Sequence, residues 1–169
     1  MNFKEIEIKN TDFNPIRDIE NSAMLTCGEI DNYNMMTITG FLCGKLFLRP
    51  SVMVYVHPDR YTYGFMESNE IFSVSFFDQQ YKEALRICGS THGNECDKAS
   101  LASLTPRSMY DTVVFEEAKI VFICEKIYHA DIESELFDSK QVFNQYYKKE
   151  NQSYHRLYLG QITKVLMKE

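Results

Sequence analysis

The sequence predicts a mainly β protein in which strands form a closed or partly closed barrel and short helices lie at its periphery. Runs rich in β-branched and aromatic residues, each about four to eight residues long, recur between turn-forming Gly, Pro, Asn and Asp. The helical patterns are short and fall between these runs. The chain has 169 residues, enough to bury a sizeable core, and shows no internal repeat or linker. We therefore expect a single domain over residues 1–169.

Alternating apolar and polar residues, and short continuous apolar runs at 23–27 and 51–56, predict the strands in the first part of the chain. Strands are expected over residues 3–8, 23–27, 35–41, 51–56 and 71–77. Turns are expected where Asn, Asp and Pro gather, over residues 10–21 and 29–34. Gly28 ends the second strand, and Gly40 and Gly44 indicate bends. A helix is expected over residues 61–68, with Thr62 in its first turn.

Helix caps and a bulge organise the second part of the chain. Asp78 is an N-cap candidate for a helix over residues 79–88, and Gly89 follows as its C-terminal stop. Asp97 is expected to cap a short helix that runs to Leu104. A β-rich run is expected over 113–128, with an interruption at residues 116–119. A helix is expected over 139–147, followed by a final strand over 156–166 with a bulge at Gly160.

The composition argues against several classes of function. A net charge of −6 disfavours a broad nucleic-acid surface, because phosphate backbones bind to basic faces. No run approaches the roughly 20 apolar residues of a membrane-spanning helix. The N-terminal residues alternate charged and apolar side chains, unlike a signal peptide, so we expect a cytoplasmic protein. The five cysteines lack C-x-x-C spacing, which disfavours a disulfide scaffold and a zinc ribbon. Cys88 and Cys96 flank a loop and leave a redox role open.

Hydroxyl and basic residues within the segment 34–106 suggest a phosphate site without a glycine-rich loop. Thr62 lies where a helix is expected to begin, and Arg60 precedes it. The dipole and free N–H groups of a helix N-terminus favour a phosphate dianion, and Arg can hold one with two parallel hydrogen bonds. Lys98 follows Asp97 at a second helix start and offers another cation. The alternative is that Thr62 is a plain N-cap and both basic side chains are solvated.

The order of these motifs resembles the flavin reductase-like family, whose members bind FMN in a split β-barrel and usually form homodimers. The resemblance covers residues 23–106. Each motif alone is weak evidence, whereas their order along the chain is specific. The motifs are Asn34-Met35-Met36-Thr37-Ile38-Thr39, Arg60-Tyr61-Thr62, Ser73-Val74-Ser75-Phe76-Phe77, and Ser90 with Asp97-Lys98. A weaker similarity follows in Tyr154-His155-Arg156-Leu157 at the last strand.

The resemblance implies an FMN-binding oxidoreductase on a Greek-key split barrel. NADH or NADPH would be the electron donor, and a flavin, a small molecule or a protein the acceptor. The residues expected to contact the cofactor are Asn34, Met36, Thr37, Ile38, Thr39, Phe41, Arg60, Thr62, Ser73, Ser75, Phe77, Ser90, Lys98 and His155. Of these, Thr37, Thr39, Arg60, Thr62 and Lys98 would hold the phosphate. Backbone around Met36 and residues 73–77 would hold the ring. No acid, base or metal ligand is expected, since the flavin supplies the hydride chemistry.

Two departures from the family pattern leave alternatives open. Phe41 stands where close relatives commonly carry Trp, and residues 91–96 lack the arginine of the usual Ser-Gly-Arg-Asp run. The missing arginine removes a phosphate or nicotinamide contact. It modestly favours a flavoredoxin-like electron carrier that takes electrons from a protein. A flavin-binding module without catalysis is the remaining alternative. The apolar candidates and His155 are also compatible with ordinary packing.

Overall fold

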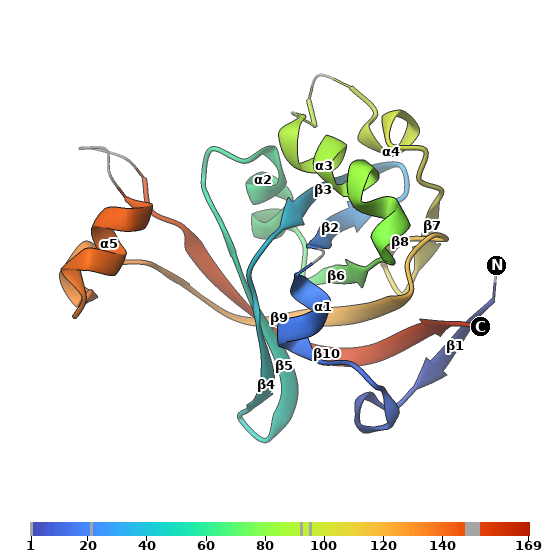
Figure 1. The fold of residues 1–169 in the computed structure, drawn as a ribbon, viewed down its shortest axis with the longest axis horizontal. Coiled ribbons are helices and arrows are strands. Elements are labelled where there is room, and N and C mark those ends of the chain that lie inside the picture. Colours follow the sequence, from blue (N-terminus) through green and yellow to red (C-terminus); the bar gives the residue numbers. More distant parts are fainter. Residues whose placement is uncertain (1, 21, 92, 95, 148–152) are drawn as a thin grey trace.

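A computed structural model describes residues 2–20, 22–91, 93–94, 96–147 and 153–169. Most strands belong to one antiparallel sheet with the order β3-β2-β6-β9-β10-β5-β4, and β1 also pairs with β10 (Figure 1). The strands of this sheet are β1 (Phe3–Ile6), β2 (Ala23–Glu29), β3 (Asn32–Ile38), β4 (Leu42–Leu46), β5 (Arg49–Val56), β6 (Ile71–Phe76), β9 (Ile120–Asp131) and β10 (Arg156–Lys168). A separate hairpin consists of β7 (Pro106–Met109) and β8 (Thr112–Phe115).

Short helices occupy the connections between strands. The α-helices are α1 (Pro15–Ile19), α2 (Tyr61–Ser68), α3 (Lys82–Ser90), α4 (Lys98–Leu101) and α5 (Lys140–Tyr146). The 3₁₀ turns are η1 (Ile8–Asn10), η2 (Gln79–Tyr81) and η3 (Ser134–Leu136). Helix α5 lies away from the sheet, at the far end of β9 and β10 (Figure 1). Among the described residues, no helix is long and apolar enough to cross a membrane.

Strand β10 bends the sheet and joins its parts. It has 13 residues and pairs with β9 along its length, with β5 through its first half and with β1 through its last residues. The register with β9 shifts between Leu159 and Gly160, which confirms the predicted bulge, and shifts again between Ile162 and Lys164. A Cβ on Gly160 would lie 2.4 Å from Cζ of Phe72. The missing side chain of Gly160 therefore lets the ring of Phe72 on β6 lie directly against β10.

Two apolar cores lie on opposite faces of strands β2, β6 and β9. The first fills the inside of the curled sheet and includes Val54, Phe72 and Tyr158. The second lies under α3, α4 and the β7–β8 hairpin and includes Leu85 and Val114. Alternate side chains of β6 enter alternate cores, as its period-two pattern predicts. The second core fixes α3 and α4 against the sheet, and so places the loop between them.

Several predicted boundaries are wrong in informative ways. The turn expected over 29–34 contains only residues 30–31, because Glu29 and Asn32 already pair across the β2–β3 hairpin. The region 10–21 contains α1, whose N-cap Asn14 accepts hydrogen bonds from the N–H groups of Ile16 and Arg17. Strand β4 was not predicted. Its Gly44 indicates a bend locally, but pairing with β5 holds the segment extended.

The caps of the later helices were predicted with mixed success. Asp97 does cap α4, since its carboxylate accepts from the N–H of Ser100 at 3.1 Å, although the helix ends at Leu101. Asp78 makes no side-chain cap bond; the turn η2 precedes α3 there, and Gly89 lies inside α3. Residues 116–119 separate β8 from β9, as predicted. The final strand and the last helix are confirmed, with bounds that differ by a few residues.

Candidate functional site

Segments far apart in the sequence meet along β3. The Asn34 side-chain amide on β3 donates to Oγ1 of Thr62 on α2 at 2.7 Å, and both residues are buried. Thr37 Oγ1, also on β3, donates to the carbonyl oxygen of Leu85 on α3 at 2.5 Å. Lys98 Nζ, at the start of α4, donates to the carbonyl oxygen of Met35 at 2.9 Å. These bonds hold β3, α2, α3 and α4 around a common point.

Lys98 is the buried charge of this cluster. Its exposed fraction is 6%, and its ammonium group donates to the carbonyl oxygens of Met35 and Cys88, the latter at 3.3 Å. No salt bridge involves Lys98 among the described residues. Burial lowers the pKa of Lys98, and the charge of Arg60 lowers it further, against the opposing effect of the thiols of Cys88 and Cys96. An anion placed beside Lys98 would offset the cost of this unpaired charge.

The N-terminus of α2 adds further positive potential. Arg60 is the N-cap residue, in an extended conformation, and makes no side-chain cap bond. The first turn contains no acidic side chain. Thr62 does not cap the helix either, because its hydroxyl accepts the bond from Asn34. Arg60 is exposed and has no salt-bridge partner within the described part of the chain. The helix start therefore presents N–H groups and a free guanidinium to an anion.

A small cavity lies between these groups. It is lined by Met36, Thr37, Arg60, Tyr61, Thr62, Cys88, Gly89, Thr91, Gly93 and Lys98. Its volume of about 20 Å³ has room for roughly one water molecule. Gly93 comes so close that a Cβ there would lie 2.0 Å from Oδ1 of Asn34. The donor set suits a phosphate, but a phosphate group enters only if the lining residues move apart.

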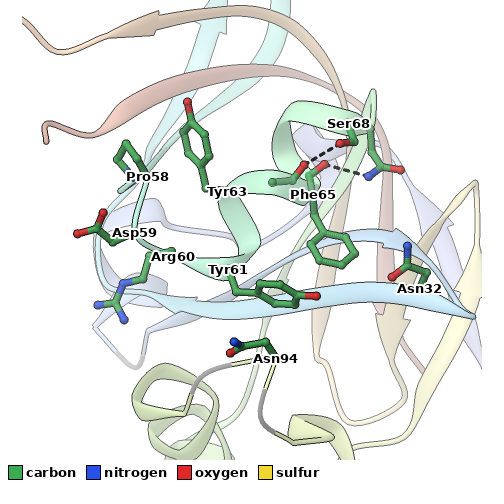
Figure 2. Close-up of a pocket in the computed structure, with 11 residues that line it drawn as sticks. Asn32, Pro58, Asp59, Arg60, Tyr61, Tyr63, Phe65, Ser68 and Asn94 are labelled. Atoms are coloured by element: carbon green, nitrogen blue, oxygen red, sulfur yellow. Dashed lines mark hydrogen bonds between the residues drawn. The ribbon is translucent and has the colours of Figure 1, made fainter.

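An open groove of about 660 Å³ adjoins this cavity (Figure 2). The groove follows the outer side of α2, and it shares Arg60 and Tyr61 with the cavity. The rings of Tyr61 and Phe65 meet edge to face, with centroids 5.5 Å apart. Figure 2 shows the Tyr61 ring extending from α2 toward Asn32. In this view Phe65 lies above the Tyr61 ring and Asn94 lies below it. The groove thus combines aromatic surface with side-chain amides.

Four of the five residues predicted to hold a phosphate come together around the small cavity: Thr37, Arg60, Thr62 and Lys98. Met36 lines it too, and Asn34 borders it through the bond to Thr62. The fifth, Thr39, is exposed beyond the end of β3 and does not line the cavity. Sequence reasoning missed Tyr61 and Gly93, although Tyr61 stands inside the Arg60–Thr62 motif.

Other predicted contact residues lie elsewhere. Ser73 is fully buried, and its hydroxyl donates to the carbonyl oxygen of Val113 at 2.7 Å. The Ser75 hydroxyl is buried without a partner among the described residues. Strand β6 is paired on both sides, with β2 and β9, so its backbone is not free to hold a ring edge. Phe77 packs in the second core. We therefore leave these residues out of the site proposed below.

Three further candidates are occupied by packing or by helix bonds. Ile38 is buried in the first core, and Phe41 packs against that core with its ring 5.4 Å from the ring of Phe76. The Ser90 hydroxyl is exposed at the end of α3 and donates to the carbonyl oxygen of Arg86 at 2.9 Å. A cofactor role for Ile38, Phe41 and Ser90 stays a prediction, without support from these contacts.

His155 lies in a cluster of rings just before β10. Its Nδ1 is 2.8 Å from the Tyr147 hydroxyl, and its ring contacts those of Tyr55 and His57 edge-on. Burial lowers the pKa of His155, and the nearby charges of His57 and Arg60 lower it further. His155 is therefore neutral at pH 7 and within electrostatic reach of Arg60. No group of His, Cys, Asp or Glu side chains suited to a metal ion occurs in the described ranges.

Comparisons with known proteins identify the family and test the fold. Residues 20–169 match the family model of the flavin reductase like domain. No curated protein matches the chain. A similar solved structure is the FMN-binding domain of a flavin reductases-like enzyme from Shewanella baltica OS155. It has a TM-score of 0.69 and 12% identity, over 98% of this chain and 77% of that chain.

Two further structures are similar at the same level. Flavoredoxin of Desulfovibrio vulgaris (Miyazaki F) has a TM-score of 0.67 and 18% identity, over 88% of this chain and 69% of that one. A protein with a split barrel domain from Shewanella frigidimarina NCIMB 400 has a TM-score of 0.67 and 11% identity, over 88% and 67%. These similarities confirm the predicted fold, a mainly β split barrel with short peripheral helices.

Proposed function

The chain belongs to the flavin reductase-like family, and we propose that it is an FMN-binding oxidoreductase. In this proposal NADH or NADPH delivers electrons to the bound flavin, which passes them to free flavin or another acceptor. The flavin supplies the hydride chemistry when it is bound. The chain's own residues bind the cofactor, orient it and set the local charge.

The buried, unpaired ammonium group of Lys98 is the observation that carries the proposal. Lys98, Arg60 and the first residues of α2 all line one small cavity. The phosphate of FMN is a dianion, so these positive groups would bind it. The bound phosphate would also offset the free-energy cost of burying the Lys98 charge. Thr37 also lines the cavity, and its hydroxyl would have to exchange the Leu85 carbonyl for a phosphate oxygen in order to donate to the ligand. Riboflavin, which lacks the phosphate, would gain little from these groups.

The direct test is an absorbance spectrum of the purified protein, followed by anaerobic addition of NADPH and NADH in separate stopped-flow experiments. We expect the bands of oxidised flavin, and their rapid bleaching by one of the two donors. Bands that persist would contradict the reductase and favour the electron carrier. The carrier is the second candidate because residues 91–96 lack the usual arginine. The lack of any bands in protein that has been incubated with FMN and then separated from unbound FMN would contradict both functions.

Substitution of Arg60 tests the phosphate site more directly than substitution of Thr62. The Thr62 hydroxyl accepts a hydrogen bond from the buried Asn34 side chain, so its loss would also affect folding. Arg60→Gln removes an exposed charge without disturbing a described ion pair. A charge-assisted hydrogen bond contributes about 1.5–3 kcal/mol, so FMN should bind roughly 10- to 100-fold more weakly. Riboflavin affinity should not change. The control is Arg107→Gln on β7, which removes an arginine and its ion pair with Glu116 outside the cavity and should leave both affinities intact. An equal loss for FMN and riboflavin would contradict phosphate recognition by Arg60.

We further propose that the protein acts in the cytoplasm and as a homodimer. Its cysteines are free, which fits a reducing compartment. The proposal of a dimer rests on the exposed apolar side chains of the β4–β5 hairpin and of helix α5.

A further inference from the structure

We propose that Cys88 and Cys96 form a redox-sensitive pair, in which a hydroperoxide converts the two thiols into a disulfide that keeps phosphate out of the small cavity. Cys88 lies in the last turns of α3, and Cys96 lies just before the N-cap of α4. Both thiols are free. Formation of the disulfide does not depend on flavin, whereas its effect on FMN rests on the proposed function.

Lys98 connects the two cysteines in space. Its Nζ donates to the carbonyl oxygen of Cys88 at 3.3 Å, and Cys96 precedes Lys98 by two residues in the chain. Cys88 and Lys98 line the small cavity, Cys96 and Lys98 line a neighbouring groove, and Gly93 lines both. Burial raises the pKa of Cys88 to about 11; Lys98 opposes this effect and the charge of Cys96 adds to it. The two thiols are therefore within electrostatic reach of one another.

The two thiols differ in their access to an oxidant. Cys96 is exposed, whereas Cys88 is 1% exposed and its raised pKa keeps the thiol protonated at neutral pH. Cys96 is therefore oxidised first. Hydrogen peroxide transfers an oxygen atom to the sulfur of Cys96, which becomes a sulfenic acid, and a water molecule is released.

Cys88 then acts as the resolving thiol. Its sulfur attacks the sulfur of the Cys96 sulfenic acid, the S–O bond breaks, and the hydroxyl group leaves as water with the proton of Cys88. The pair of thiols loses a pair of electrons and a pair of protons in total, and the peroxide is reduced to water. A thiol reductant reverses the oxidation by exchange at the disulfide.

The disulfide would hold the cavity in its narrow form. Thr91 and Gly93 lie between the two cysteines in the chain, and both line the cavity. Gly93 is so close to Asn34 that a Cβ on it would lie 2.0 Å from Oδ1. A disulfide keeps the Cα atoms of its cysteines about 4.4–6.8 Å apart, so it would tie Cys96 to α3. Because a phosphate enters only if the lining residues move apart, the oxidised protein should bind FMN more weakly.

The other cysteines provide the control. Cys27 and Cys124 are fully buried, and Cys43 is half-buried against the first core. None of these three lines the small cavity. Cys43→Ser therefore removes a partly accessible thiol away from the cavity. Cys96→Ser removes the exposed thiol and leaves every residue that lines the cavity in place.

The experiment measures the affinity of the flavin-free full chain for FMN and riboflavin before peroxide treatment, after it, and after reduction with dithiothreitol. Peptide mapping by mass spectrometry locates any disulfide, and circular dichroism confirms the fold. We expect a bond between Cys88 and Cys96. FMN affinity should fall roughly tenfold or more, as for the loss of one charge-assisted contact, and should recover on reduction. Riboflavin affinity should change little. Cys43→Ser should respond like the natural protein, and Cys96→Ser should bind FMN normally and keep this affinity after peroxide.

Each other outcome overturns a defined part of the proposal. If Cys96 forms no bond to Cys88, or if the disulfide joins Cys43 and Cys124, the assigned pair is wrong. If the expected disulfide forms and FMN affinity does not change, the pair does not control the cavity. An equal loss for FMN and riboflavin would contradict a selective effect on the phosphate. If the reduced protein binds no FMN, the proposed function fails, while the peptide map still tests the pair.

Discussion

The ammonium group of Lys98 is buried beside the carbonyl oxygens of Met35 and Cys88, with no anion next to it among the described residues. Two hydrogen bonds replace only part of its hydration, so the charge opposes folding when no ligand is bound. Lys98→Met should therefore raise the free energy of unfolding of the flavin-free protein at pH 7 by about 1 kcal/mol. It should also weaken FMN at least about tenfold while sparing riboflavin. Denaturant unfolding and flavin titration measure the two effects.

The same residue predicts a pH dependence. Burial lowers the pKa of Lys98 in the folded protein below the ordinary value of 10.5 that applies when the chain is unfolded. Between these two pKa values the unfolded chain binds the extra proton, so stability rises as the pH rises through this window. The stability of the flavin-free natural protein relative to Lys98→Met should therefore rise between neutral and alkaline pH. The comparison is needed because burial raises the pKa of thiols such as Cys88, to about 11, and their ionisation lowers the stability of both proteins at alkaline pH. Parallel unfolding curves for the two proteins at every pH would contradict the assignment to Lys98.

At the scale of elements, the β4–β5 hairpin has an unfavourable turn. Its loop residues Phe47 and Leu48 have φ angles of 49° and 62°, and their exposed fractions are 67% and 87%. A left-handed conformation at both positions is the one that two-residue turns with Asn-Gly adopt readily, and it is costly for Phe and Leu. The double variant Phe47→Asn with Leu48→Gly should stabilise the monomer by about 1–2 kcal/mol.

Denaturant unfolding at low protein concentration measures this gain. The β7–β8 hairpin provides a matched comparison, because its loop residues Tyr110 and Asp111 also have positive φ angles, 52° and 59°. The variant Tyr110→Asn with Asp111→Gly should be stabilised through the same turn. It should gain less, since it loses the hydrogen bond from the Tyr110 hydroxyl to Glu5. If the β4–β5 variant is no more stable than the natural protein, the turn is not strained.

At the scale of the whole molecule, the same hairpin carries apolar surface that a single copy leaves exposed. Leu42 and Leu46 on the edge strand β4 are exposed, as are Phe47 and Leu48 in the β4–β5 loop. Val142 and Tyr146 are exposed on α5, a helix that lies away from the sheet (Figure 1). Edge strands and apolar patches of this kind are usually covered in an assembly. Light scattering should therefore show a dimer. The β4–β5 variant should shift toward monomer, while the β7–β8 variant should stay dimeric. A monomeric natural protein would contradict the proposed homodimer.

Local sequence patterns determined much of the fold. A short apolar run predicted β2, period-two alternation predicted β6, and cap chemistry predicted α4, because each signal depends on side chains within a few residues of one another. Strand β4 was missed because its extended conformation comes from pairing with β5. Sequence resemblance also placed Thr37, Arg60, Thr62 and Lys98 in one site, and all four line one cavity.

Only the tertiary structure decided which hydroxyls and charges are free to bind. Ser73 and Thr62 both carry hydroxyl groups within family motifs. The Ser73 side chain is nevertheless buried between the sheet and the β7–β8 hairpin, whereas Thr62 lines a cavity. A lysine after a helix cap is expected to be solvated, but the packing of α4 against β3 and α3 buries Lys98. Burial and the distance between remote segments depend on the whole set of contacts, and no local pattern in the chain contains them.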